Sequence, residues 1–305
     1  PVKECAMKSK KKKAFSNWIG LLYVSPWLIG FLLFTLYPIL SSVYYSFTDF
    51  SIASAPVWIG FKNYVEIFTK DKLALPSLAI TFKYVFLSVP AKLIFALFVA
   101  MILNTNMKGV NFYRTVYYLP SILGGSVAIA VLWRFLFRRD GIVNLILQAV
   151  GLPYLDWIGS PKFALGTVAL LAVWQFGSSM VLFLSGLKQV PQELYEAAEV
   201  DGATKVRQFF SITLPMITPV VSFNVIMQLI NGFQEFTGPY VITSGGPLNS
   251  TYVFAIHLYN SAFKYFRTGY ASALSWILFM AITVFTVILF KFFDRFTYYE
   301  DGGKF

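Results

Sequence analysis

The stretch of sequence that decides the fold covers residues 191–215 and reads PQELYEAAEVDGATKVRQFFSITLP. Pro191 suits the first turn of a helix, where its missing N–H would be unpaired in any case, and Glu193 lies near the positive end of the helix dipole. Gly202 can adopt the left-handed conformation that ends a helix, and a second amphipathic stretch follows from Ala203 to Phe210. The segment therefore predicts a short helix, a bend and another short helix.

This segment lies between long apolar stretches in a chain of unusual composition. The 305 residues are 57% hydrophobic and only 13% charged, whereas a soluble domain has about 45–50% apolar and about 25% charged residues. The balance excludes a typical soluble enzyme and a disordered chain. The length fits six spans of about 20 residues, so we predict an all-α membrane protein with about six transmembrane helices. The predicted spans are 18–40, 79–103, 113–137, 163–187, 216–241 and 269–292.

The first apolar stretch follows six lysines within residues 3–13 and could be mistaken for a secretory signal. Ala53-Ser54-Ala55 even resembles a cleavage site. The apolar core of a signal peptide spans about 7–15 residues, and this stretch is much longer. The candidate cleavage site also lies well beyond its end. We therefore interpret the stretch as a retained first transmembrane helix.

The distribution of Lys and Arg predicts the orientation of the chain. With the N-terminus in the cytoplasm, the inner segments hold 14 basic residues and the outer loops hold 8. This excess predicts that both termini and the 188–215 loop are cytoplasmic. The net charge of +11 would suggest nucleic acid for a soluble protein. In this hydrophobic chain it indicates cytoplasmic loops and contact with membrane lipids, so we expect no nucleic-acid partner.

The inventory of reactive side chains is small. Cys5 is the single cysteine, which excludes an intrachain disulfide framework and a cysteine zinc site. His257 is the single histidine, and we interpret it as an interfacial residue rather than a ligand or proton relay. We expect no catalytic residue and no metal site. The sequence also contains no G-x-x-x-x-G-K-[ST] loop to cradle the phosphates of ATP.

The 191–215 segment could be a plain interfacial hairpin or an element that docks a partner. Ala197 and Ala198 would let a partner backbone approach closely, and Glu196 and Asp201 offer carboxylates to a partner's Arg or Lys. The residues alone leave both interpretations open.

The spacing of the segment resembles the EAA loop of the membrane subunits of binding-protein-dependent ABC importers. Glu196-Ala197-Ala198 is followed after three residues by Gly202 and after nine more by Ile212-x-Leu214-Pro215. Other stretches resemble the sugar-permease branch, which includes maltose- and glycerol-phosphate-type permeases. They are Phe112–Thr115 with Tyr118–Pro120, Phe236–Pro247, Thr251 and Gly269–Ser275. The resemblance covers most of residues 15–295.

The resemblance implies a type I ABC importer permease fold in the bacterial cytoplasmic (inner) membrane. The domains would be a basic N-terminus (1–17), a permease domain (18–295) with the coupling loop 188–215, and a cytoplasmic tail (296–305). The coupling residues would be Glu196, Ala197, Ala198, Asp201 and Gly202, docked on an ATPase dimer that binds ATP and Mg. This chain would bind no cofactor and would not hydrolyse ATP. A second permease, similar but distinct, and an extracellular or periplasmic solute-binding protein complete the expected partners.

The fifth predicted span carries four polar residues on one helix face: Asn224, Gln228, Asn231 and Glu235. Such a face should turn toward protein or a water-filled cavity rather than lipid. It could serve interhelical hydrogen bonding or line the path of a carbohydrate, whose hydroxyl groups suit amides. We favour the sugar path, with an oligosaccharide as the substrate.

Two lysines lie in the second predicted span. Lys83 can extend its amine to the outer interface. Lys92 lies about 20 Å along the helix, and two interpretations stay open. It could attract an acidic sugar such as a uronate oligosaccharide, or it could form a buried pair with Glu235 or a partner subunit.

Two other classes of protein compete with an importer permease. An ion-driven secondary transporter of a small polar solute predicts inverted repeats and broken helices at a midplane site, and we find neither in the sequence. A membrane enzyme acting on lipid or glycan would need more than the single His257 and few intramembrane acids. Neither class accounts for the 191–215 segment.

Overall fold

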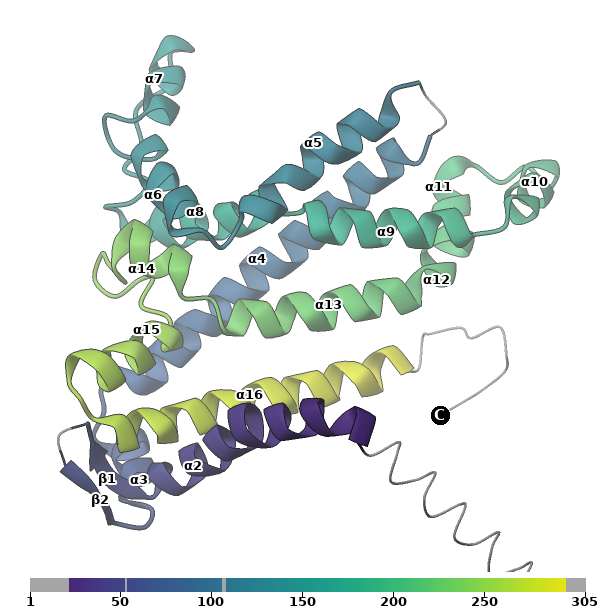
Figure 1. Ribbon diagram of the computed structural model, residues 1–305. Helices are drawn as coiled ribbons and strands as arrows, with labels where there is room; N and C mark the ends of the chain where they lie inside the picture. Colours follow the sequence, from purple (N-terminus) through teal and green to yellow (C-terminus); the bar gives the residue numbers. More distant parts are fainter. Residues whose placement is uncertain (1–21, 53, 106–107, 295–305) are drawn as a thin grey trace, which may run out of the picture. The chain divides into compact units, whose positions relative to one another are not determined.

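The computed structural model describes residues 22–52, 54–105 and 108–294, and helices dominate this part of the chain (Figure 1). The lysine-rich segment 1–17, the start of the first predicted span and the predicted tail 296–305 lie outside the described residues.

The elements follow one another as a series of helices interrupted by one small sheet. The first helix runs from Leu22 to Ser46 and includes a π-helical turn, η1 (Leu32–Leu36), and α2 (Tyr37–Ser46). The elements after it are β1 (Thr48–Ser51), β2 (Ser54–Trp58), α3 (Lys62–Thr69), α4 (Ala74–Leu103), α5 (Val110–Leu123), α6 (Val127–Leu136), α7 (Ile142–Ala149), α8 (Pro161–Trp174), α9 (Gly177–Gln189), α10 (Gln192–Val200), α11 (Lys205–Gln208), η2 (Phe209–Thr213), α12 (Leu214–Met216), α13 (Thr218–Phe233), α14 (Thr237–Thr243), α15 (Phe254–Tyr259), η3 (Asn260–Lys264) and α16 (Thr268–Asp294).

The chain divides into two compact units. The first comprises the described residues up to Glu66 together with Ser261–Trp276. In it β1 and β2 pair antiparallel, with Thr48 opposite Trp58. The buried Asn63 fastens this hairpin, because its side-chain amide donates to the backbone oxygens of Ser46 and Thr48, both at 2.9 Å.

The second unit comprises Ile67–Asn260 and the described residues from Ile277, and α4 forms its centre. Helices α8, α9, α13 and α15 pack against α4. Close packing of α13 on α4 depends on Gly232, because a side-chain carbon there would lie 3.2 Å from the side chain of Val85. Figure 1 shows α10 and α11 at one end of this unit and α14 and α15 at the other.

The described residues contain three helices long and apolar enough to cross a membrane: Leu22–Ser46, Ala74–Leu103 and Thr268–Asp294. Three further pairs of helices pass together but are bent: α5 with α6 by 102°, α8 with α9 by 48°, and Lys205–Met216 with α13 by 69°. Counted as one span each, the bent pairs raise the number to six, as predicted. The third, fourth and fifth predicted spans are therefore broken rather than continuous.

Local sequence accounts for the sharpest break. Gly125 adopts a φ of +80°, a backbone conformation that favours glycine. The hydroxyl of Ser126 then accepts a hydrogen bond from the N–H of Ala128 at 3.2 Å and caps the start of α6.

The predicted boundaries of the fifth span, 216–241, are wrong. The bent helix begins at Lys205 and ends at Phe233, and residues 237–243 form the separate helix α14.

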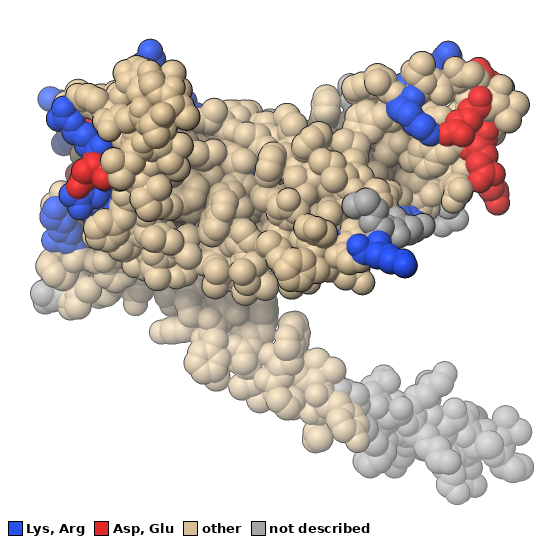
Figure 2. Space-filling view, turned by 90° about the horizontal axis from the view of Figure 1, so that it is seen from above, with Lys and Arg blue, Asp and Glu red and all other residues tan. Residues whose placement is uncertain are grey.

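The surface charge fits a chain that crosses a membrane. On the face drawn in Figure 2, charged side chains gather at the end where α10 lies and at the opposite end of the face. A broad band with few Lys, Arg, Asp or Glu side chains lies between these groups. Such a band is what the hydrocarbon core of a bilayer requires, because charges within it are costly.

Candidate functional site

A polar pocket lies beside the centre of α4, with a volume of about 390 Å³. Its walls come from α4, from α5 and the glycines after it, from both sides of the α8–α9 break, and from α13 and the residues that follow it. The lining residues are Tyr84, Ser88, Val89, Lys92, Ser121, Gly124, Gly125, Ala172, Gln175, Ser178, Gln228, Asn231, Gly232, Gln234 and Glu235. Hydroxyl and amide groups predominate, so the pocket can both donate and accept hydrogen bonds.

The helix breaks build one wall of this pocket. The hydroxyl of Ser121 donates to the backbone oxygen of Gln175 and accepts from the N–H of Ser178, both at 3.0 Å, which ties α5 to the α8–α9 break. The Gln175 side chain lies against Gly124, where an added side-chain carbon would come within 2.5 Å of it. The breaks therefore bring polar side chains from two spans to one place.

Lys92 and Gln228 meet across the pocket from α4 and α13. The ammonium of Lys92 donates to Oε1 of Gln228 at 2.8 Å. Glu235 also lines the pocket, and its Oε1 accepts from the N–H of Gly238 at 2.8 Å. Among the ion pairs of the described residues, within 4.0 Å, none joins Lys92 to Glu235. The structure thus gives Lys92 a direct amide partner, with the carboxylate of Glu235 as a charged neighbour in the same pocket.

The structure brings together four of the five residues predicted for the substrate path: Lys92, Gln228, Asn231 and Glu235. Asn224 is fully buried and lies outside the pocket lining, with neither amide atom hydrogen-bonded to the described residues. Six polar residues of the pocket are not among those predicted from the sequence: Tyr84, Ser88, Ser121, Gln175, Ser178 and Gln234. Tyr84 and Ser88 precede Lys92 by eight and four residues, so helical spacing from Lys92 could have found them.

Residues 191–215 form the predicted helix, bend and helix. Helix α10 ends at Val200, and Gly202, two residues beyond it, adopts a φ of +73°. The N–H of Gly202 donates to the backbone oxygen of Glu199 at 3.0 Å. The hydroxyl of Thr204 then caps α11. Of the five predicted coupling residues, Glu196, Ala197, Asp201 and Gly202 are exposed, and Ala198 is partly exposed.

Side-chain contacts hold this hairpin together. Glu199 and Lys205 form an ion pair across the bend, and the hydrogen bond from Lys205 lowers the pKa of Glu199 from its ordinary value. Tyr195 and Thr213 share a hydrogen bond of 2.8 Å between their hydroxyl oxygens, which ties α10 to η2. The hairpin thus presents α10 as an exposed, negatively charged helix, and these contacts hold it in place.

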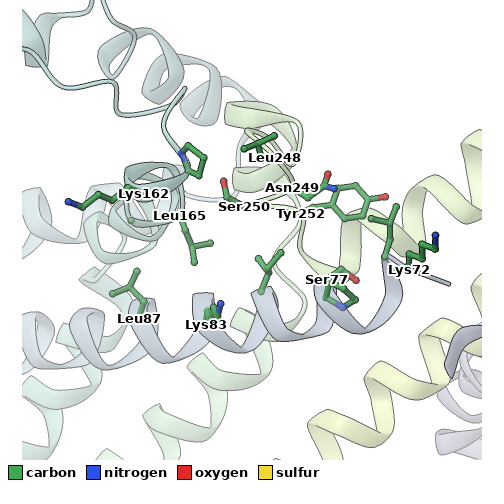
Figure 3. Close-up of a pocket in the computed structure, with 15 residues that line it drawn as sticks. Lys72, Ser77, Lys83, Leu87, Lys162, Leu165, Leu248, Asn249, Ser250 and Tyr252 are labelled. Carbon is green, nitrogen blue, oxygen red and sulfur yellow. The ribbon is translucent and has the colours of Figure 1, made fainter. Parts of the chain in front are cut away.

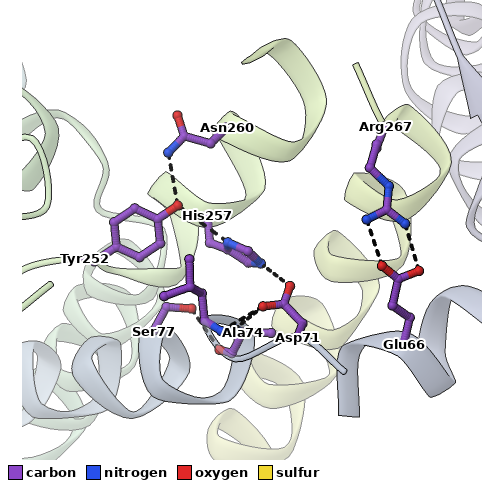
Figure 4. Close-up of polar contacts among 9 residues, drawn as sticks. Glu66, Asp71, Ala74, Ser77, Tyr252, His257, Asn260 and Arg267 are labelled. Carbon is purple, nitrogen blue, oxygen red and sulfur yellow. Dashed lines mark hydrogen bonds and ion pairs between the residues drawn. The ribbon is translucent and has the colours of Figure 1, made fainter. Parts of the chain in front are cut away.

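His257, interpreted from the sequence as an interfacial residue, is buried within the second unit. Its side chain is 6% exposed, and Nε2 lies 2.8 Å from Oδ2 of Asp71, as Figure 4 shows. Nδ1 lies 3.5 Å from the hydroxyl of Tyr252, which accepts from the amide of Asn260 at 3.0 Å. Separately, Arg267 donates twice to Glu66 within the first unit, each bond 2.8 Å long.

Comparisons with known proteins agree with this architecture. The family described as "Binding-protein-dependent transport system inner membrane component" matches residues 5–298. The "Probable ABC transporter permease protein YesP" of Bacillus subtilis is 47% identical over 299 residues, 97% of each chain. The "Trehalose/maltose transport system permease protein MalF" of Thermococcus litoralis is 30% identical, over 90% of this chain and 92% of that protein.

A solved structure shares the fold. It is a chain of a bacterial ABC transporter involved in the import of the acidic polysaccharide alginate, with a TM-score of 0.81 at 21% identity. The alignment covers 94% of this chain and 99% of that chain. The protein therefore belongs to the family of binding-protein-dependent transport system inner membrane components, as a permease of a sugar ABC importer.

Proposed function

We propose that the polar pocket beside α4 is part of the path along which the importer moves its oligosaccharide. The observation that carries the proposal is the convergence of Lys92, Gln228, Asn231 and Glu235 on one cavity with the hydroxyl groups of α4 and α5. Amides and hydroxyls match the donors and acceptors of a sugar. The proposal leaves Asn224 out of direct contact, because its side chain is fully buried.

We further propose that Lys92 attracts an acidic group of the substrate, such as the carboxylate of a uronate unit. Its ammonium reaches into a polar cavity and is held by Gln228. Gln228 is neutral, so it orients the ammonium without cancelling its charge. Glu235 is held at the start of α14 by Gly238, which keeps one of its carboxylate oxygens occupied. A substrate carboxylate that enters the pocket would therefore meet a positioned cation and would compete for it with the neighbouring carboxylate of Glu235.

Uptake by the importer reconstituted in liposomes tests this role, with an acidic and a neutral oligosaccharide of equal length as substrates. Lys92→Gln keeps most of the side-chain length and removes the charge. We expect about tenfold slower uptake of the acidic substrate and little change for the neutral one. The factor corresponds to the loss of one hydrogen bond between charged groups.

Lys70→Gln is the matched control, because it removes the same charge from an exposed residue outside the pocket. Uptake of both substrates should stay as in the wild type. If Lys92→Gln leaves uptake of the acidic substrate unchanged, Lys92 is not its counter-ion. If both substrates slow down equally, the pocket serves the path but does not select charge.

We propose that α10 and its bend are the surface through which this chain engages a separate ATPase dimer. Glu196 and Asp201 offer carboxylates, Ala197 and Ala198 allow close approach, and Gly202 sets the turn. ATP and Mg would be bound by the ATPase, so this chain would be a non-catalytic subunit. A pull-down from membranes tests the contact: an ATPase should co-purify with the wild type, and Glu196→Lys should weaken this co-purification.

The remaining partners are proposed from the family and the fold. A solute-binding protein would deliver the sugar from outside, and a second permease, similar but distinct, would complete the path in the bacterial inner membrane. Quantification of the purified complex tests the stoichiometry. Two different permeases, each present once, would support the heterodimer, and two copies of this chain would contradict it.

A further inference from the structure

Two membrane-crossing helices have their ends at the small hairpin of the first unit. The first helix, Leu22–Ser46, ends directly before β1. The start of α16 packs on the same strand so closely that a side-chain carbon at Gly269 would overlap the backbone oxygen of Thr48. With the N-terminus in the cytoplasm, as the distribution of Lys and Arg predicts, these two helix ends and the hairpin lie on the outer side of the membrane.

The lengths of the two helices set the depth of the hairpin. The first helix has 25 residues and α16 has 27. These lengths correspond to about 37 Å and about 40 Å, whereas the hydrocarbon core of a bilayer is about 30 Å thick. Both helices therefore extend beyond the core and end among the lipid head groups. The hairpin begins at that level.

The chain leaves this level where it enters α4. Lys72 lies two residues before the start of α4 and lines a pocket of about 610 Å³ beside it. Figure 3 shows the ammonium of Lys72 directed away from this pocket. A lysine at the end of a span extends its amine toward the head groups in this way. The segment 47–73 thus joins the first helix to α4 along one surface of the bilayer.

The hairpin and the start of α3 expose apolar side chains at this level. Val57 is 62% exposed, Trp58 61% and Phe61 69%. The ring centroid of Phe47 lies 5.6 Å from that of Trp58 and 5.2 Å from that of Phe61, so the three rings form one cluster. Val65 is also exposed, one helical turn after Phe61. Val57, Trp58, Phe61 and Val65 are called the outer patch below.

The outer patch continues the apolar face of the first helix. Three exposed residues of α2 lie on one face, at intervals of three and four: Tyr37, Leu40 and Tyr44. The ring of Tyr44, in the last turn, lies 6.0 Å from that of Trp58. The exposed apolar surface therefore runs without a break from within the span to the level of the head groups.

The polar side chains of α3 point back to the protein. Asn63 is buried under the hairpin, as described above, and Glu66 accepts two hydrogen bonds from Arg267, as Figure 4 shows. The guanidinium of Arg267 lies 4.3 Å from the ring centroid of Tyr270 in α16. A helix on a surface that faces water has the opposite arrangement, with its apolar side chains inward. The outer patch thus calls for an apolar environment.

We propose that the outer patch inserts into the outer leaflet, at the boundary between head groups and acyl chains, and so fixes the depth of the first helix and of α16. Aromatic rings such as those of Trp58 and Tyr44 prefer this boundary. A soluble partner that comes and goes would leave the patch in water between encounters, which a large apolar surface disfavours. The proposal is independent of the function proposed for the polar pocket.

Fluorescence quenching in the importer complex, reconstituted in lipid nanodiscs, tests the proposal. Because Cys5 is the single cysteine of the chain, Cys5→Ser allows a bimane label at one introduced cysteine. The partner subunits carry no reactive cysteine in this experiment. Val65→Cys reports on the outer patch, Leu33→Cys on the middle of the first helix, and Lys108→Cys on an exposed loop.

The quenchers are iodide in water and phosphatidylcholine with a nitroxide near the top or near the end of its acyl chain. At Val65→Cys we expect the upper nitroxide to quench more than the lower one, and iodide to quench little. The order of the two nitroxides should be reversed at Leu33→Cys, which lies deeper in the bilayer. At Lys108→Cys iodide should quench most.

Removal of the rings tests what holds the patch at this depth. In Trp58→Ser/Phe61→Ser, the label at Val65→Cys should lose quenching by the upper nitroxide and gain quenching by iodide. Trp58→Tyr/Phe61→Tyr is the matched control, because it keeps both rings, and should keep the original profile. If the serine pair does not assemble with its partner subunits, Trp58→Ser alone should shift the profile in the same direction.

Three results would overturn the proposal. Quenching at Val65→Cys by iodide alone would place the outer patch in water, where the solute-binding protein could meet it. Protection from all three quenchers, with a cross-link from Val65→Cys to the other permease, would identify a subunit interface. A profile that the serine pair leaves unchanged would show that the rings do not set the depth.

Discussion

At the scale of single residues, Asp71 holds two elements with one carboxylate. Its Oδ1 accepts from the N–H groups of Leu73 and Ala74 at 2.7 and 3.1 Å, which caps the start of α4. Its Oδ2 contacts His257, so the same group fastens α15 to α4. The N–H of Phe254 adds a second fastening, because it donates to the hydroxyl of Thr81 at 2.8 Å.

We predict that Asp71→Ala destabilises the complex by about 1–3 kcal/mol, because two N–H groups at the start of α4 and the buried His257 lose this acceptor. Asp71→Asn should cost less, since its amide oxygen can still cap the helix and its amide nitrogen can still donate to His257. Thermal unfolding of the purified complex measures the difference. Equal unfolding temperatures for Asp71→Ala and the wild type would show that the contact contributes nothing.

Residues differ in how much their sequence context reveals. Gln228, Asn231 and Glu235 could be found in advance because polar residues at helical spacing are rare in a span. Ser121 could not, because the backbone groups of Gln175 and Ser178 that its hydroxyl contacts lie 54 and 57 positions away. The partner of His257 lies 186 positions away, and no local pattern identifies such a pair.

At the scale of helices, Gly177 sets how closely α9 approaches α5. A side-chain carbon at Gly177 would lie 2.6 Å from the backbone oxygen of Tyr117 and 2.7 Å from the Cα of Tyr118. Both obstacles are backbone atoms, so the helices themselves would have to move apart. Ser121 and Ser178, which join the two helices and line the polar pocket, lie next to this contact.

We predict that Gly177→Ala lowers stability by about 1–3 kcal/mol, because overpacking between two helix backbones cannot be relieved by a change of rotamer. Sugar uptake should fall with it, since the pocket wall shifts. Gly30→Ala is the matched control, because no atom lies within 4 Å of the added carbon. Uptake and unfolding of both variants can be measured side by side. A wild-type profile for Gly177→Ala would mean that the helices can separate freely.

The existence of the spans was predictable, and their breaks were not. Apolar content identifies a segment that must avoid water, but it says nothing about the direction of the helix axis. Residues 113–137 therefore read as one span, although Gly124, Gly125 and Ser126 offered a turn and a cap in its middle. Pro215 and Pro219 likewise mark where the 69° bend before α13 occurs. Such residues permit a bend, but the angle of the bend depends on how the neighbouring helices pack.

At the scale of the whole molecule, the proposed coupling surface and the proposed sugar path are separate places that α9 and α13 connect. Helix α9 connects the pocket wall at Ser178 with the start of α10, and α13 returns from the hairpin to Gln228. A movement imposed on α10 can reach the pocket along either helix. This arrangement predicts that substitutions in the hairpin reduce transport while ATP hydrolysis continues and the chain still inserts into the membrane.

We predict that Glu196→Lys and Gly202→Pro uncouple ATP hydrolysis from uptake while the chain still inserts. Proline removes the N–H that Gly202 donates to Glu199 and fixes φ near −65°, whereas the native φ is +73°. Gly202→Asn is the matched control, because asparagine tolerates the left-handed conformation and an added side-chain carbon meets no atom within 4 Å.

Paired measurements of ATPase activity and sugar uptake in liposomes test the prediction. Transport in the two damaging variants should fall far more than ATP hydrolysis, and Gly202→Asn should stay close to the wild type. ATP-dependent uptake that persists in Gly202→Pro would remove the hairpin from the coupling route. Uptake that survives ATP depletion and collapses with an ion gradient would contradict an ATP-driven mechanism altogether.

Lys83 and Lys92 are nine residues apart in α4, so they lie on opposite faces of the helix. This spacing limits the insertions and deletions that the helix can accept. Substitutions between the two lysines alter one surface at a time, but a deletion or insertion rotates everything beyond it by about 100°. One lost residue would turn Lys92 away from Gln228 and carry every later side chain of the helix to a new neighbour. The number of residues between the two lysines therefore decides whether Lys92 can meet Gln228.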